Sequence, residues 1–190
     1  MKRIEKLMVL FRKHDPDTFR HCQSVGMHML EWAACMGFSN KKMQIAYNCG
    51  LMHDIGRLCL PGNVFNKLGT LSEDEQNIHK LHTVYGWAIL NSMGLKELSL
   101  IIRYHHEWYD GTGYQEGLKE GEIPILSRMI SVCDAFDEMT NRQEHNNMTG
   151  QQALRELENC AGTRFDPWLC QQFINYIRKI ETIKVVANFA

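Results

Sequence analysis

Apolar side chains recur every three or four residues along most of the chain, whereas the strict alternation typical of half-buried strands is nearly absent. This periodicity predicts an all-α fold, because a helix brings positions three and four apart onto one face. A single-domain bundle of seven to eight helices accommodates the pattern. The predicted helices cover residues 4–12, 17–36, 40–54, 72–93, 95–107, 124–140, 150–160 and 166–180.

Residues that begin or end helices lie at these boundaries. Pro16 separates the first two helices, and Gly37 can end the second in a left-handed conformation. Ser72, followed by Glu75 three residues later, is a capping-box pattern that begins the helix over 72–93. Pro124 begins a later helix. The boundary residues therefore support the helices that the periodicity predicts.

The chain shows no repeat, low-complexity segment or flexible linker. We divide it into an N-terminal helix at residues 1–16, a main domain at residues 17–181 and a short β-prone tail at residues 182–190. The basic N-terminal segment has only a short apolar run and no cleavage site, so we interpret it as an amphipathic helix. No apolar run approaches the ~18 residues that a membrane span needs.

Composition narrows the class of protein. The 190 residues carry 21 basic and 22 acidic side chains, a formal charge of −1, and no basic block. This balance argues against an electrostatic surface for duplex nucleic acid. The 7 cysteines include no C-x-x-C pair, which predicts free thiols and a cytoplasmic location. We expect a soluble protein that binds a small molecule or another protein.

Histidine and aspartate residues lie within otherwise apolar helical segments. A single such residue is more often a hydrogen-bonded core group, but seven on helices that share one core would be costly to bury without a common purpose. Imidazole with carboxylate suits Fe, Mn, Zn, Co or Ni, and two adjacent sites could share Asp54. The seven residues are His21, His53, Asp54, His82, His105, His106 and Asp134.

The order of the motifs resembles the HD-GYP domain, the metal-dependent phosphodiesterase branch of the HD superfamily. The resemblance extends from about Asp17 to Arg142, and the pairing of an HHE segment with DGxGY is its most specific part. The motifs are His21, the segment Leu51 to Arg57 with its His53-Asp54 pair, the segment Asn66 to Leu71 with Glu75, His82 with Gly86, Tyr104-His105-His106-Glu107, Asp110-Gly111-Thr112-Gly113-Tyr114, Ile123-Pro124 with Arg128, and Asp134-Ala135-Phe136-Asp137.

The resemblance implies hydrolysis of a cyclic dinucleotide, most often cyclic di-GMP, to the linear dinucleotide or GMP. It implies two transition-metal ions, with iron or manganese favoured and zinc, cobalt or nickel compatible. One ion would be held by His21, His53, Asp54 and Asp134, and the other by Asp54, His82, His105 and His106. A hydroxide between the ions would attack the phosphorus. Arg57, where the family usually has a lysine facing the phosphate, joins Asp54 as a catalytic candidate.

Other residues are candidates for metal binding or for contacts with the substrate. His79 competes with His82 on spacing alone, but the family's histidine precedes a glycine by four residues, which fits His82 with Gly86. Asp17 lies one turn before His21, where some relatives place a ligand for a third metal, although we favour Asp17 as an N-cap. The candidate substrate contacts, besides Arg57, are Lys67, Trp108, Tyr109 and Arg142.

Two segments depart from the family pattern. The tripeptide that names the family reads Gly113-Tyr114-Gln115, without its proline, and residues 140–146 lack most of the family's base-binding residues. The alternatives are a phosphohydrolase for another nucleotide, such as cyclic GMP-AMP, a short oligonucleotide or a nucleoside monophosphate, and a catalytically silent module that binds nucleotides or proteins. The GYP loop of relatives is linked to docking of GGDEF-type partners, an inference that Gln115 weakens.

Overall fold

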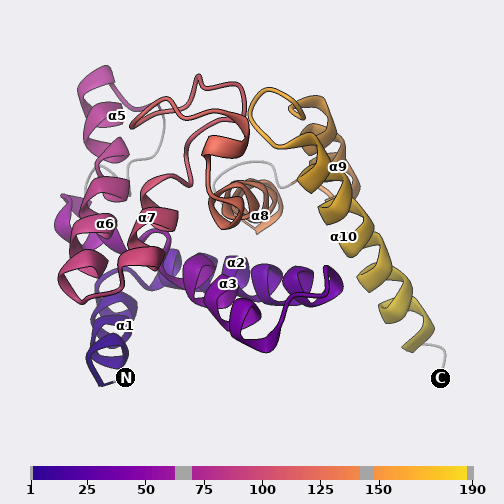
Figure 1. Cartoon of the computed structure of the whole chain (residues 1–190), viewed down its shortest axis with the longest axis horizontal. Helices are drawn as coiled ribbons and strands as arrows, with labels where there is room; N and C mark the ends of the chain where they lie inside the picture. The colour runs from indigo at the N-terminus through magenta and orange to yellow at the C-terminus, as the bar shows by residue number, and fades with distance from the viewer. Residues whose placement is uncertain (1, 63–69, 142–147, 188–190) are drawn as a thin grey trace.

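The computed structural model describes residues 2–62, 70–141 and 148–187, and its described elements are helices and turns, with one isolated bridge between Ala161 and Phe165 (Figure 1). The predicted all-α fold is confirmed. The helices are α1 (Lys2–His14), α2 (Pro16–Cys35), α3 (Asn40–Met52), α5 (Glu73–Lys80), α6 (His82–Ser92), α7 (Lys96–Arg103), α8 (Ile125–Asn141), α9 (Gly150–Asn159) and α10 (Pro167–Ala187), with 3-10 turns η1 (Ile55–Cys59) and η2 (Glu120–Glu122).

The beginning of α2 corrects one prediction. Asp15 is the N-cap, and its side chain accepts a hydrogen bond from the Thr18 amide at 3.0 Å. Asp17 lies in the first turn instead, so its predicted capping role is wrong. The reason is Pro16, which occupies the first helical position and therefore leaves the cap to the residue before it.

Three predicted helices are shorter than the periodicity suggested. α3 ends at Met52 and α7 at Arg103, so His53 and His105 lie just beyond helix ends. The helix expected over 72–93 is two helices, because the chain turns at Leu81 and α6 begins at His82. The capping box at Ser72 is present as predicted. The predicted helices were thus too long at positions that carry candidate ligands.

Two apolar clusters form the core on either side of these positions. The larger joins α2, α3, α8, α9 and α10 around fully buried residues such as Trp32 and Phe173. The smaller includes Phe11 of α1 and Leu90 of α6. Helix α2 contributes to both clusters, and Figure 1 shows α8 end-on between the α6 and α7 side and the α9 and α10 side. The candidate ligands lie where these parts meet.

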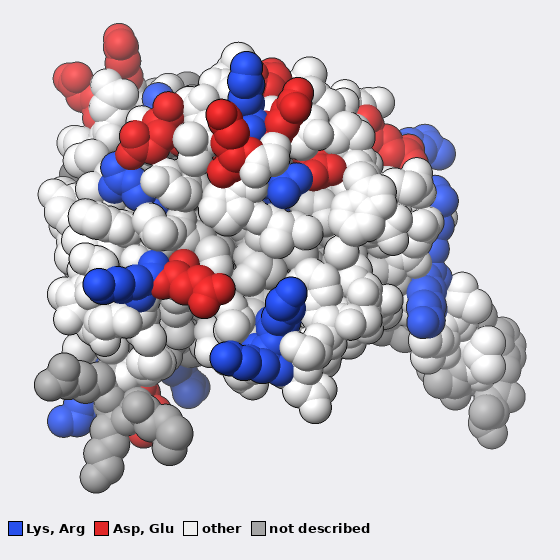
Figure 2. Space-filling model, viewed as in Figure 1, with Lys and Arg blue, Asp and Glu red and all other residues white. Residues whose placement is uncertain are grey.

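The C-terminal helix is longer than predicted. α10 continues to Ala187, past the expected end at residue 180, so most of the β-prone tail is helical. Among the described residues, no helix is both long and apolar enough to cross a bilayer. On the face shown in Figure 2, basic and acidic side chains are interspersed, in agreement with the near-zero net charge.

Candidate metal centre

Six of the seven predicted ligands converge in two groups of three. Within each group, one ligand atom from each residue lies within 4.8 Å of the others. They come from α2, the end of α3, the beginning of α6 and the turn after α7, which are far apart in the sequence. The groups are His82, His105 and His106, and His21, His53 and Asp54.

Two aspartates contact these histidines, and one of them, Asp54, links the two groups. Asp134 on α8 places Oδ1 2.9 Å from His21 Nε2 and 3.5 Å from His53 Nε2. Asp54 places one carboxylate oxygen 3.3 Å from His82 Nε2 and the other 3.8 Å from His53 Nε2. Asp54 therefore lies between the groups, where a carboxylate shared by two ions would have to be.

Backbone carbonyls fix the orientation of three imidazoles. His53, His82 and His105 each donate an Nδ1–H bond, 2.6–2.8 Å long, to the carbonyl three residues earlier. Burial lowers the pKa of His82 and His105, so in these neutral rings this tautomer leaves Nε2 as an unprotonated acceptor, and the two Nε2 atoms lie 3.4 Å apart. The buried Nε2 of His53 has no hydrogen-bond partner. Facing lone pairs in a dry interior repel each other, and a cation removes the repulsion, so these donors fit transition metals.

The two groups differ in the pKa values of their histidines. Burial lowers the pKa of His105 to about 3 and also lowers the pKa of His82 and His106, so all three imidazoles are neutral. Burial opposes protonation of His21 too, but hydrogen bonds with Asp134 and Asp137 outweigh it and raise its pKa to about 10. The group of His82, His105 and His106 is therefore ready to bind a cation. In the group that contains His21, a metal would replace a proton.

Around His21 is a layer of residues that the ligand prediction did not include. His21 Nδ1 lies 2.7 Å from Asp137 Oδ2, and Asp137 Oδ1 accepts hydrogen bonds from Ser24 and from Asn141 Nδ2. A ligand held in this way keeps its ring orientation. The spacing Asp134-x-x-Asp137, one turn of α8, was the available signal, since both carboxylates share a helix face.

Arg57 lies in the interior beside the candidate centre. It is 5% exposed, and its terminal nitrogens lie 3.3 Å from Asp54 and 3.3 Å from Asp15. Both carboxylates hold the guanidinium against the centre. Contact with a phosphate stays a prediction, and the pairing with Asp15 had no signal in the sequence.

The loop after His106 packs onto the centre. The Tyr114 ring stacks on His106, with centroids 5.0 Å apart and an interplanar angle of 25°. Gln115, where the family has proline, has a φ of 108° and donates from Nε2 to Thr83 Oγ1 at 2.6 Å and to the Lys80 carbonyl at 3.0 Å. The loop is thereby attached to the beginning of α6, which carries His82.

Three of the remaining candidates lie in the described parts of the chain. The side chain of Asp17 is 83% exposed and paired with Arg20, so the structure does not bring it to the ligands as a third-metal residue. Trp108 is 37% exposed and Tyr109 is partly buried in the loop that follows the ligand pair. Lys67 and Arg142 lie outside the described residues.

This helical scaffold with a His and Asp centre defines a known family. A family model for the HD domain matches residues 7–169, and the chain belongs to that family, as the motifs indicated.

Curated relatives include a "Cyclic di-GMP phosphodiesterase" of Thermotoga maritima, 34% identical over 95% of this chain and 50% of the relative. A "3'3'-cGAMP-specific phosphodiesterase 2" of Vibrio cholerae is 28% identical over 84% of this chain and 31% of the relative. The chain thus spans at most about half the length of these relatives.

Solved structures share the fold. An HDG"Y"P protein from Bdellovibrio bacteriovorus has a TM-score of 0.69 at 21% identity, covering 84% of this chain and 52% of that one. The HD domain of the phosphodiesterase PgpH from L. monocytogenes, in complex with cyclic-di-AMP, has a TM-score of 0.67 at 17% identity, covering 94% and 96%.

Proposed function

We propose that this chain is a metal-dependent phosphodiesterase that hydrolyses a cyclic dinucleotide, with cyclic di-GMP as the first candidate. The observation that carries the proposal is the buried pair of His82 and His105 Nε2 atoms, 3.4 Å apart and beside Asp54. The 34% identity to a protein named a cyclic di-GMP phosphodiesterase supports the substrate class. The proposal assigns hydrolysis to residues 17–181.

The expected ligand sets are those given by the motifs, with Asp54 common to both ions. Two bound ions would supply an activated water near neutral pH and would neutralise charge on the phosphate. Iron or manganese is our first choice because the resemblance to the HD-GYP domain implies it, and zinc, cobalt or nickel are compatible with the same ligand set. The free thiols at all seven cysteines fit the reducing cytoplasm that we propose as the location.

The chain's own residues orient the imidazole ligands and neutralise charge at the centre. The backbone carbonyls hold His53, His82 and His105 in one tautomer, so no rearrangement precedes ligand binding. Arg57 beside Asp54 offsets the negative charge of the shared carboxylate. Tyr114 stacks on His106 and covers one side of its ring.

A second candidate is hydrolysis of cyclic GMP-AMP. It is favoured by the relatives named as specific for that compound and by the departure from the family's base-binding segment at residues 140–146. A silent binding module is disfavoured, since degenerate members would be expected to lose ligands and the seven candidate ligands of this chain are all present.

The test combines metal analysis with turnover. Purified protein is reconstituted without oxygen with Fe(II) or Mn(II), dialysed, and assayed against cyclic di-GMP, cyclic GMP-AMP and cyclic di-AMP. Two ions per chain and hydrolysis of a cyclic dinucleotide are expected. Asp54→Asn should lose metal and activity, whereas Asp74→Asn on the exposed face of α5 should behave as wild type. Fewer than two ions together with no turnover would contradict the proposal.

A further inference from the structure

Arg164 has no carboxylate partner in the part of the chain that the structure describes. Among the described residues, no ion pair or side-chain hydrogen bond involves its guanidinium, and its buried Nε has no partner. By contrast, Arg103 pairs with Glu116 and Arg128 pairs with Asp166. A positive charge left unpaired beside an anion-binding site is available for an anionic ligand.

Aromatic rings hold this side chain in place. The Arg164 guanidinium carbon lies 4.9 Å from the Phe165 ring centre and 6.0 Å from that of Trp108. Rings at these distances attract the cation and restrict its rotamers without using its hydrogen-bond donors. Because Nε is buried, the terminal nitrogens are the groups left to meet a ligand.

The turn that carries Arg164 is attached to the loop that follows the ligand pair. The Arg164 carbonyl accepts a hydrogen bond from the Tyr109 amide at 3.2 Å, and the Thr163 carbonyl accepts one from the Asp110 amide at 2.9 Å. Figure 1 shows the turn between α9 and α10 beside the long loop that leads to α8. Trp108, which the guanidinium faces, follows His106 by two residues.

The proposed substrate needs a second cationic contact. A cyclic dinucleotide has two phosphodiesters, and metal ions at the centre would neutralise only the one that reacts. Arg57 is already held by Asp54 and Asp15. We propose that Arg164 binds the second, unreacting phosphate of the cyclic dinucleotide through its terminal nitrogens. A planar guanidinium matches two phosphate oxygens, which a lysine at this place would not.

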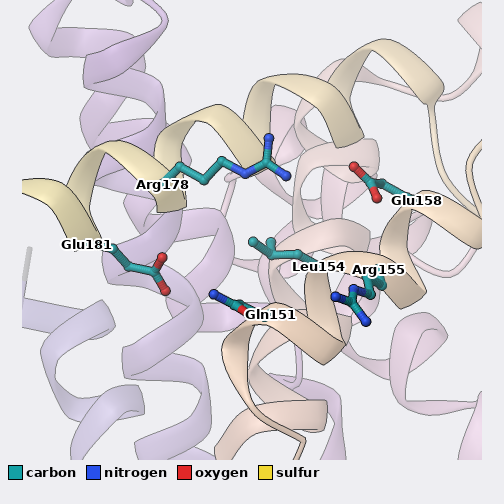
Figure 3. Close-up of a pocket in the computed structure, with 6 residues that line it drawn as sticks. All are labelled: Gln151, Leu154, Arg155, Glu158, Arg178 and Glu181. Atoms are coloured by element: carbon teal, nitrogen blue, oxygen red, sulfur yellow. The ribbon is translucent and has the colours of Figure 1, made fainter.

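This inference rests on the proposed phosphodiesterase function, and the experiment separates the two. Metal-loaded wild type, Arg164→Gln and Arg164→Lys are compared on cyclic di-GMP and on bis(4-nitrophenyl) phosphate, which has a single phosphate. The matched control is Arg155→Gln. Arg155 is exposed on α9 and lines the groove of mixed charge between α9 and α10 that Figure 3 shows.

Arg164→Gln is expected to raise KM for cyclic di-GMP by about 10-fold to 100-fold, the range for losing a charged hydrogen bond. Metal content, kcat and turnover of bis(4-nitrophenyl) phosphate should stay within about twofold of wild type, because the centre itself is unchanged. Arg164→Lys should recover part of the loss, and Arg155→Gln should show none.

Cyclic GMP-AMP, used as substrate or competitive inhibitor, tests whether the Arg164 contact is independent of the bases. A phosphate contact predicts the same factor for both dinucleotides. A loss that differs between them by more than about fivefold, or an equal loss on bis(4-nitrophenyl) phosphate, would overturn the assignment. An unchanged KM in Arg164→Gln would overturn it as well. If wild type hydrolyses no cyclic dinucleotide, the proposed function fails instead.

Discussion

The approach of Gly56 to α6 leaves no room for a side chain. A Cβ built on Gly56 would lie 1.9 Å from the His82 carbonyl oxygen and 2.5 Å from the Gly86 amide nitrogen. Both neighbours are backbone atoms, so neither can rotate away. We therefore expect Gly56→Ala to push η1 and the beginning of α6 apart, between Asp54 on one side and His82 on the other.

The required displacement can be worked out from these distances. To reach even 3.0 Å, the shortest contact that a Cβ tolerates, the carbonyl must retreat by about 1.1 Å. Metal-ligand distances hold to about ±0.2 Å, so a shift of this size at His82 is several times what the site tolerates. We expect metal affinity to fall by about 10-fold to 100-fold. Overpacking should also cost about 1–3 kcal/mol of folding free energy.

The assay measures both consequences. Thermal unfolding of the metal-free variant should show a melting temperature about 3–10 °C below wild type, given the chain length. Metal content after dialysis against a competing chelator should be lower. Gly121→Ala is the control, because a Cβ at Gly121 meets nothing within 4 Å. If Gly56→Ala melts and retains metal as wild type does, the backbone contact is not as close as described and the reasoning is refuted.

Three further predictions concern other parts of the fold. Arg128→Ala removes the cation that pairs with the buried Asp166 and should lower the free energy of unfolding, measured by chemical denaturation, by about 3 kcal/mol. A decrease below about 0.5 kcal/mol would contradict the ion pair. Iodoacetamide should label exposed Cys59 but not buried Cys133, whose pKa burial raises, until the protein unfolds; early labelling of Cys133 by mass spectrometry would be the contrary result. Gln115→Pro, which restores the family tripeptide, should lower the melting temperature, because proline cannot adopt a φ of 108°; an unchanged melting temperature would argue against that loop conformation.

The helices could be predicted from the local sequence pattern. The capping box at Ser72 and Glu75 formed as predicted, because its hydrogen bonds join residues three apart. The N-cap of α2 was misassigned to Asp17, although Pro16 was the local signal for Asp15. Where the predicted helices were too long, at His53 and His105, no breaker residue marked the end.

The candidate centre was predicted by residue type and not by geometry. Buried polar side chains on apolar helix faces, together with the motif order, selected the seven candidate ligands. Nothing local could show that Arg57 pairs with Asp15, or that Arg164 lies over Trp108. These contacts join segments that meet only when the helices pack.

By itself, the sequence determined the helical fold class and the family, and it predicted a set of candidate metal ligands. Periodicity and side-chain chemistry are local properties, so one chain without its structure is enough for them. The tertiary structure decided which nitrogen of each imidazole faces the interior, where helices end to present a ligand, and which cations remain unpaired. Those features depend on contacts such as His21 with Asp134, which are 113 residues apart, and only the packed fold brings such residues together.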